Sequence, residues 1–125
     1  MSAKNKEIVE KVNASFAEGS VEGFLAHCAD DVVWTIVGNK TTRGKNAIRE
    51  WMASIDMEPP KFTVENIIAE GDFVTAYGDM TLKEKDDKTV PYAYCDIYCF
   101  REGKIVELNS FLIKSEAKAE SASGV

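Results

Sequence analysis

The sequence predicts an α+β domain in which three N-terminal helices pack against a strongly curved, mainly antiparallel sheet. In the first half of the 125-residue chain, apolar residues recur mostly at helical spacing. The second half consists of β-branched and aromatic runs separated by glycine-containing or charged turns. Helices followed by a strand meander are typical of α+β proteins, whose helices cover one face of the sheet. A strongly bent sheet of this kind can enclose a pocket against the third helix.

Three amphipathic patterns predict the helices. The first covers residues 5–16 and is followed by Gly19, a residue typical of helix C-termini. The second begins at Ser20, a favourable N-cap, and ends at residues 30–31. The third covers residues 47–55, and two consecutive prolines prevent its extension. The apolar residues that support these helices are Ile8, Val9, Val12 and Phe16, then Val21, Phe24, Leu25 and Cys28, then Ala47, Ile48, Trp51, Met52 and Ile55.

Five strands are expected beside these helices. A β-branched and aromatic run over residues 32–37 precedes the third helix and stops at Gly38. Four later runs form an antiparallel meander over residues 62–69, 73–83, 90–100 and 105–113. Residues 115–125 contain too few apolar side chains to pack against a core. We therefore expect a single domain over residues 1–114 and a disordered tail over residues 115–125.

The charge of the chain limits its partners. It carries 15 Lys plus Arg against 21 Asp plus Glu, a formal net charge of −6 at pH 7. No basic run provides the surface that nucleic acids or anionic membranes require. No apolar stretch approaches the roughly 20 residues that cross a bilayer, and the N-terminus lacks the apolar segment of a signal peptide. We expect no nucleic-acid or membrane partner and a cytoplasmic location.

The cysteines and the single histidine predict neither disulfides nor a metal site. Cys28, Cys95 and Cys99 form an odd set in a chain without a signal peptide, as free thiols in a reducing compartment would. On a strand, Cys95 and Cys99 would lie about 13 Å apart, too far to share a disulfide or a metal ion. His27 could act as a base, but the simpler expectation is a partly exposed histidine at the C-terminal end of the second helix, where the helix dipole favours it. No nucleotide-binding or triad-hydrolase motif is present, so no cofactor is expected.

Asp96 is the leading candidate for chemistry, because aspartate is depleted within strands. A three-residue turn would pair Phe100 with Lys104 and place Asp96 opposite Leu108. Asp96 would then share an apolar face with Val106, Leu108, Ser110 and Leu112, and desolvation there would raise its pKa towards the range useful for proton transfer. A two-residue turn would instead place Asn109 and Phe111 beside it. We favour the first register.

Other interpretations of the acidic residues remain open. Asp96 would have a structural role if it bound a buried hydroxyl group or faced a dimer interface. Asp79 is a second mid-strand acid, and the two carboxyls would share a face only under one parity of strand pairing. The simpler expectation for Asp79 is exposure to solvent.

Aromatic and apolar residues on several predicted elements would form a ligand pocket around Asp96. Such sites are mostly apolar with a few placed polar groups. The same large side chains could equally belong to the core. The expected pocket residues are Trp34, Ile36, Trp51, Met52, Tyr94, Tyr98, Leu108 and Ser110.

Three segments resemble one known superfamily in order and spacing: ADDVVW at residues 29–34, GKNAIREW at residues 44–51 and FREGKIV at residues 100–106. The sequence resembles nuclear transport factor 2-like proteins of the SnoaL-like or ketosteroid isomerase-like branch. This resemblance implies a cone-shaped sheet closed by three helices around an apolar pocket, and a homodimer formed through the outer sheet face. Members of the superfamily include isomerases, cyclases, hydrolases and proteins without known catalysis, so the fold transfers better than the function.

The resemblance transfers only one ketosteroid isomerase residue. The protonated oxyanion-hole aspartate of that enzyme corresponds to Asp96, a type of site in which a carboxylic acid stays neutral. Its tyrosine corresponds to Val12, and its general base to Thr35 or Ile36. Steroid isomerisation by that mechanism is therefore not expected. The epoxide hydrolase pattern is not matched either, because Tyr94 occupies the position of an arginine.

Two functions are consistent with these features. In the first, the protein binds a small apolar organic molecule and acts as a cofactor-independent isomerase or cyclase, with Asp96 as acid or base. In the second, it is a non-catalytic ligand-binding or dimerisation module whose pocket is filled by Trp34, Trp51 and Met52. Binding of another protein, as by a transport factor, would require an exposed apolar patch beyond the dimer face.

Overall fold

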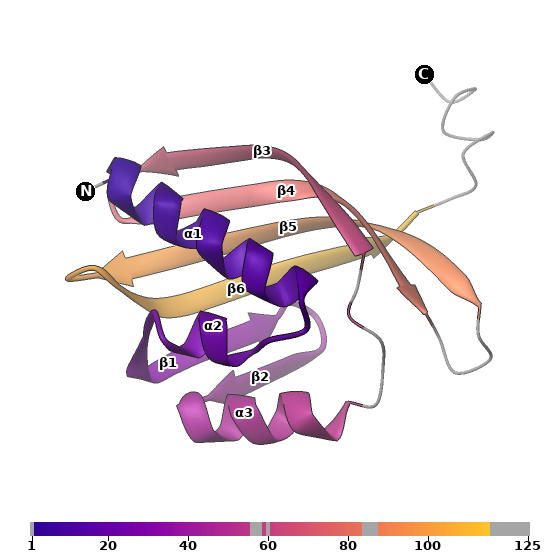
Figure 1. Ribbon diagram of the computed structural model, residues 1–125, viewed down its shortest axis with the longest axis horizontal. Coiled ribbons are helices and arrows are strands. Elements are labelled where there is room, and N and C mark those ends of the chain that lie inside the picture. Colours follow the sequence, from indigo (N-terminus) through magenta and orange to yellow (C-terminus); the bar gives the residue numbers. More distant parts are fainter. Residues whose placement is uncertain (1, 56–58, 60, 84–87, 116–125) are drawn as a thin grey trace.

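In the computed structural model, the described residues form three helices that pack against a six-stranded sheet (Figure 1). The structure describes residues 2–55, 59, 61–83 and 88–115. Apart from Ser115, the predicted tail lies outside the described residues. The elements are α1 (Ser2–Ala17), α2 (Glu22–Leu25), β1 (Cys28–Ile36), β2 (Lys40–Arg43), α3 (Lys45–Ser54), β3 (Lys61–Glu70), β4 (Phe73–Lys83), β5 (Thr89–Arg101) and β6 (Lys104–Lys114).

The sheet confirms the predicted α+β class. Its strand order is β2-β1-β6-β5-β4-β3, and of the strand pairs that the described residues form, β1–β6 is parallel and the others are antiparallel. Strands β3 to β6 form the predicted meander. Helix α1 lies across one face of the meander, whereas α3 packs beside β1 and β2 (Figure 1). No helix of the described residues is long and apolar enough to span a membrane.

The segment between α2 and α3 differs from the prediction in two ways. Helix α2 ends at Leu25 rather than near residue 30, because Cys28 already pairs with Ile105 of β6. Strand β2 was not predicted, and it forms a hairpin with the end of β1. Its sequence Lys-Thr-Thr-Arg carries no apolar signal, since only Thr42 is buried.

The hydrophobic core lies between the helices and the inner face of the sheet. Val9 and Val12 of α1 and Phe24 of α2 are completely buried there. From the sheet, the core contains Val32, Val74, Ala76, Tyr98, Phe100, Ile105 and Leu108. Burial of these side chains from both layers explains why the helical stripes and the strand alternation were readable in the sequence.

A bulge in β3 bends the sheet beside the candidate site. The pairing of β3 with β4 shifts between Val64 and Asn66, opposite Gly78. A Cβ atom on Gly78 would lie 2.0 Å from the carbonyl oxygen of Thr63, so this position requires glycine. The hydroxyl group of Tyr94 donates a hydrogen bond to the same carbonyl oxygen over 3.0 Å. The bulge therefore fixes the end of the Tyr94 side chain as well as the bend.

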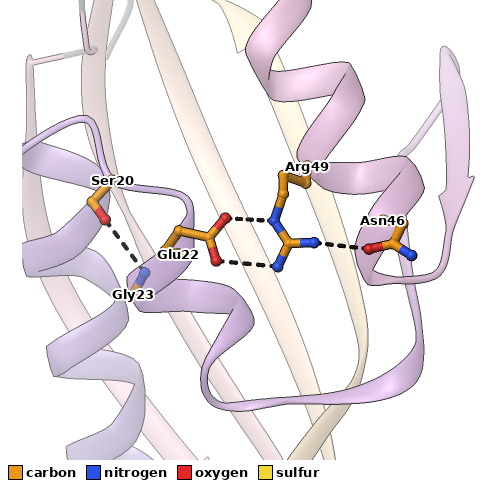
Figure 2. Close-up of polar contacts among 5 residues, drawn as sticks. All are labelled: Ser20, Glu22, Gly23, Asn46 and Arg49. Atoms are coloured by element: carbon orange, nitrogen blue, oxygen red, sulfur yellow. Dashed lines mark hydrogen bonds and ion pairs between the residues drawn. The ribbon is translucent and has the colours of Figure 1, made fainter.

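An ion pair connects α2 to α3 (Figure 2). The Arg49 guanidinium donates two hydrogen bonds to the Glu22 carboxylate, from Nε over 2.6 Å and from Nη2 over 3.1 Å. Its Nη1 donates to Asn46 Oδ1 over 2.8 Å. The hydrogen bond from Arg49 lowers the pKa of Glu22. This contact joins the two helices at an exposed site.

Candidate functional site

A cavity of about 370 Å³ lies between the helices and the concave face of the sheet. Its wall is mostly apolar, and its volume falls within the roughly 300–1,000 Å³ of small-molecule sites. The wall includes Asp96 and seven of the eight other predicted residues: Trp34, Ile36, Trp51, Met52, Tyr94, Leu108 and Ser110. The structure thus brings together side chains from β1, α3, β5 and β6.

Tyr98 is the predicted pocket residue that is not part of this wall. It has the same strand parity as Tyr94 and Asp96, but its ring is completely buried in the core. Alternation along a strand identifies the face of a residue and not its position along a curved sheet. Tyr98 therefore lies on the inner face, beyond the cavity.

Several wall residues were not anticipated from the sequence. They come mainly from elements whose position over the sheet the sequence did not fix: Asn13, Phe16, Gly19, Val21, Ile55, Pro59, Phe62, Met80 and Leu82. Asn13 had a readable signal, because it interrupts the apolar stripe of α1 between Val9 and Phe16. A polar residue at a buried helical position requires an explanation.

The turn between β5 and β6 corrects the predicted register. Arg101, not Phe100, pairs with Lys104, so Glu102 and Gly103 form a two-residue turn with φ values of 53° and 80°. The pairing then shifts between Cys99 and Phe100. Asp96 consequently pairs with Ser110, and the predicted pairing with Leu108 is wrong.

Because of this shift, Asp96 still faces the side of the sheet that was predicted for it. Leu108, Ser110 and Leu112 line the same cavity as its carboxyl group. Asn109 and Phe111 pair with Ile97 and Cys95, which have the opposite strand parity. The second predicted register, which placed Asn109 and Phe111 beside Asp96, is therefore also wrong.

Asp96 ends a short chain of hydrogen bonds within the wall. Trp34 Nε1 donates to Ser110 Oγ over 3.0 Å, and the Ser110 hydroxyl is hydrogen-bonded to the Asp96 carboxyl. Burial raises the pKa of Asp96 to about 6, although the Ser110 hydrogen bond acts in the opposite direction. Burial also raises the pKa of Tyr94 to about 12, with a smaller contribution from the Asp96 charge. Near neutral pH, Asp96 is thus the wall group best suited to exchange protons.

Asp79 and His27 do not join Asp96. Asp79 pairs with Ala93 and is exposed on the outer face, whereas Ala76 is the β4 residue opposite Asp96. The two carboxyls therefore cannot share a proton. His27 is half-buried after α2 and is not among the cavity residues. Among the described residues, no group of three His, Cys, Asp or Glu side chains is placed to hold a metal ion.

Aromatic rings form much of the wall. Trp34 and Trp51 make an edge-to-face contact with centroids 5.2 Å apart, and Phe16 lies 5.7 Å from Trp34. Phe62 and Tyr94 form a second edge-to-face pair with centroids 6.0 Å apart. A planar apolar molecule can pack against such ring faces and edges.

The sequence matches the SnoaL-like domain family over residues 9–108. No curated protein matches the chain. Among solved structures, an NTF2-like protein of unknown function from Burkholderia pseudomallei K96243 has a TM-score of 0.81 at 17% identity. That alignment covers 98% of this chain and 97% of the other.

Two further solved structures have names that refer to an activity or a ligand. A protein from Jannaschia sp. CCS1, provisionally assigned as a SnoaL-like polyketide cyclase, has a TM-score of 0.80 at 14% identity, over 90% of this chain and 87% of the other. TerC, co-crystallized with polyporic acid, has a TM-score of 0.76 at 21% identity, over 86% and 89%. At these identities the similarity shows that the fold is NTF2-like.

Proposed function

The chain belongs to the SnoaL-like domain family, and from this membership we propose that it binds a small apolar organic molecule in the cavity and catalyses a proton transfer of the isomerase or cyclase type. The position of Asp96 carries the proposal. Among the described residues, it supplies the one carboxyl group on the wall of a mostly apolar cavity. The name of the Jannaschia structure supports the reaction class, and the co-crystal of TerC supports small-molecule binding.

The proposed chemistry uses Asp96 as both base and acid. With a pKa of about 6, the carboxyl group has substantial populations of both protonation states near neutral pH. As carboxylate, it removes a proton from a carbon next to a carbonyl group, and as carboxylic acid it returns the proton to another position. The hydrogen bond from Ser110 orients the carboxyl group, and the apolar wall keeps bulk water away from the anionic intermediate.

The surroundings of Asp96 favour a single acid–base group over the ketosteroid isomerase arrangement. Val12 is completely buried in the core and offers no hydroxyl group. Ile36 lines the cavity, and the Thr35 hydroxyl is hydrogen-bonded to Thr41 outside it. A second base is therefore lacking at the corresponding positions, and we do not propose steroid isomerisation.

The cavity volume bears on the alternative of a module whose pocket is filled by its own side chains. Trp34, Trp51 and Met52 line the space and leave about 370 Å³ between the walls. This supports a ligand-binding cavity over a core filled by these side chains. A non-catalytic binding protein would use the same cavity, with Asp96 as a hydrogen-bonding anchor.

We also propose that the protein is a cytoplasmic homodimer paired through the outer sheet face. Ile68, Phe73 and Ile113 are 54%, 53% and 67% exposed on the side of the sheet opposite the core. Covering such a patch with a second copy would remove apolar area from water. The free thiols of Cys28, Cys95 and Cys99 support a reducing compartment.

The proposed proton transfer can be tested by deuterium exchange. β-Tetralone, an enolisable aromatic ketone, is incubated in D₂O with the wild type, Asp96→Asn or Asp79→Asn, and NMR follows deuterium uptake beside the carbonyl group. We expect acceleration by the wild type and by Asp79→Asn, whose carboxyl lies on the outer face, and loss of the acceleration in Asp96→Asn. If Asp96→Asn exchanges as fast as the wild type, the catalytic assignment is wrong. If β-tetralone binds to the wild type without accelerated exchange, the non-catalytic alternative is favoured.

A further inference from the structure

Asn13 places an unpaired hydrogen-bond donor on the cavity wall. It lies on the buried side of α1, between Val9 and Phe16, and the residue is only 8% exposed. Its Nδ2 atom has no hydrogen-bond partner within the described part of the chain. A buried amide without a partner lowers the stability of a fold, and asparagine is also a weak helix former. Asn13 therefore lowers the stability of the fold, and its packing does not explain why it is there.

The other polar groups of the wall already have partners. Trp34 Nε1 donates to Ser110, the Ser110 hydroxyl is hydrogen-bonded to Asp96, and the Tyr94 hydroxyl donates to a backbone carbonyl oxygen. Thr42 and Tyr98 also have buried unpaired hydroxyl groups, but neither residue lines the cavity. Among the described residues, Asn13 is thus the wall residue whose donor is left for a bound molecule.

We propose that the Asn13 amide donates a hydrogen bond to a carbonyl oxygen of the ligand, and that the ligand is an aromatic ketone or quinone. This inference rests on the proposed function and adds the substrate class. The amide requires an acceptor, and the described residues of the wall include no Lys or Arg that would compensate an anionic one. Phe16 follows Asn13 by three residues on α1, its ring contacts Trp34, and Trp34 contacts Trp51. All three rings line the same cavity as Asn13 and suit a planar ring system.

A pair of probes that differ in one atom tests this inference. Methyl naphthyl ketone carries the carbonyl oxygen, and isopropenylnaphthalene has a methylene group in its place with nearly the same shape. Calorimetry measures the binding of both to the wild type, Asn13→Leu and Asn5→Leu. Asn5 is also buried on α1 but is not a cavity residue, so the same substitution there is a matched control.

We expect the wild type and Asn5→Leu to bind the ketone about tenfold more tightly than the hydrocarbon, and Asn13→Leu to lose this preference. In the wild type, the side-chain NH₂ resonance of Asn13 should move with the ketone and not with the hydrocarbon, an observation that needs no variant. Equal wild-type binding of the two probes, or an unchanged preference in Asn13→Leu, would overturn this inference and leave the proposed apolar binding intact. Failure of both probes to bind would overturn the proposed function as well.

Discussion

Trp34 and Ser110 are joined by a hydrogen bond of 3.0 Å from the indole Nε1 to the serine hydroxyl, although they lie 76 residues apart in the sequence. The parallel pairing of β1 with β6 brings them together, because it places Trp34 beside Leu108 and Ile36 beside Ser110. The antiparallel pairing of β5 with β6 then places Asp96 opposite Ser110. The environment of the candidate acid thus depends on three strands that meet only in the folded sheet.

Ser110→Ala should raise the pKa of Asp96 above about 6. The Ser110 hydrogen bond is the interaction that lowers this pKa against the effect of burial, so its loss leaves desolvation unopposed. Carboxyl-resolved NMR titration measures the shift, with Asp96→Asn to assign the signal. Ser110→Thr retains a hydroxyl group and should keep the pKa closer to the wild-type value. An unchanged pKa in Ser110→Ala would show that the hydroxyl group does not act on Asp96.

The same substitution should reduce stability, because Trp34 loses the acceptor for its indole N–H. An unsatisfied buried donor costs roughly 1–3 kcal/mol, and the Trp34 donor is partly buried. Urea unfolding of Ser110→Ala should therefore give a lower free energy of unfolding than the wild type. Trp34→Phe removes the donor and keeps an aromatic ring, and in that background Ser110→Ala should cost less. Additive effects of the two substitutions would contradict the predicted coupling.

Stability should fall as pH rises through the pKa of Asp96. The folded-state pKa of about 6 exceeds the ordinary aspartate value of 3.8, so the folded protein binds the proton more tightly than the unfolded chain. The contribution of the neutral carboxyl is complete below the unfolded value and is lost between about pH 4 and pH 6. A shift of this size corresponds to roughly 2–3 kcal/mol.

Comparison with Asp96→Asn isolates this contribution from the other titrating groups. The free energy of unfolding of the wild type, measured from pH 4 to pH 7.5, should decrease relative to that of Asp96→Asn. Asp79→Asn, at an exposed site on the outer face, should follow the wild type. Parallel profiles for the wild type and Asp96→Asn would mean that burial does not perturb Asp96.

The features that sequence predicted best are those that periodicity encodes. The apolar stripes of α1 and α3 and the alternation in β3 to β6 reflect burial on one face, and the predicted order of these elements is confirmed. Strand β2 was missed because its four residues are polar and are held by backbone pairing with β1. The local sequence pattern of a strand does not show which strand it pairs with.

The candidate site was predicted less completely, for geometric reasons. Asp96 was expected to face inwards, and it does, but the three-residue turn behind that expectation does not form. A two-residue turn followed by a bulge gives Asp96 the same orientation. Asn13 was missed because α1 was predicted from its apolar residues alone, and the polar residue between them was not considered. Neither the curvature of the sheet nor the position of α1 over it can be obtained from alternation.

Ile113→Glu should convert the proposed homodimer into a monomer. Ile113 is 67% exposed on the outer face, and a carboxylate there would have to be desolvated in a dimer interface. Analytical ultracentrifugation of the wild type and the variant measures the change in mass, and circular dichroism checks that the fold persists. Val37→Glu, at another exposed apolar residue outside the sheet face, should leave the mass unchanged. A monomeric wild type would show that the outer face does not pair copies of this chain.

Gly78→Ala should be strongly destabilising, although it adds a single methyl group. The new Cβ atom would lie 2.0 Å from Thr63 O and 2.9 Å from the backbone nitrogen of Glu65, and these are backbone atoms of the β3 bulge that cannot rotate away. Relief requires β3 to separate from β4, with a loss of pairing and of the Tyr94 hydrogen bond to Thr63, so we expect a cost of about 3 kcal/mol or more in urea unfolding. Because Phe62 and Tyr94 line the cavity, the ketone probe should also bind more weakly to this variant. Wild-type stability in Gly78→Ala would mean that the bulge moves freely and does not fix the shape of the cavity.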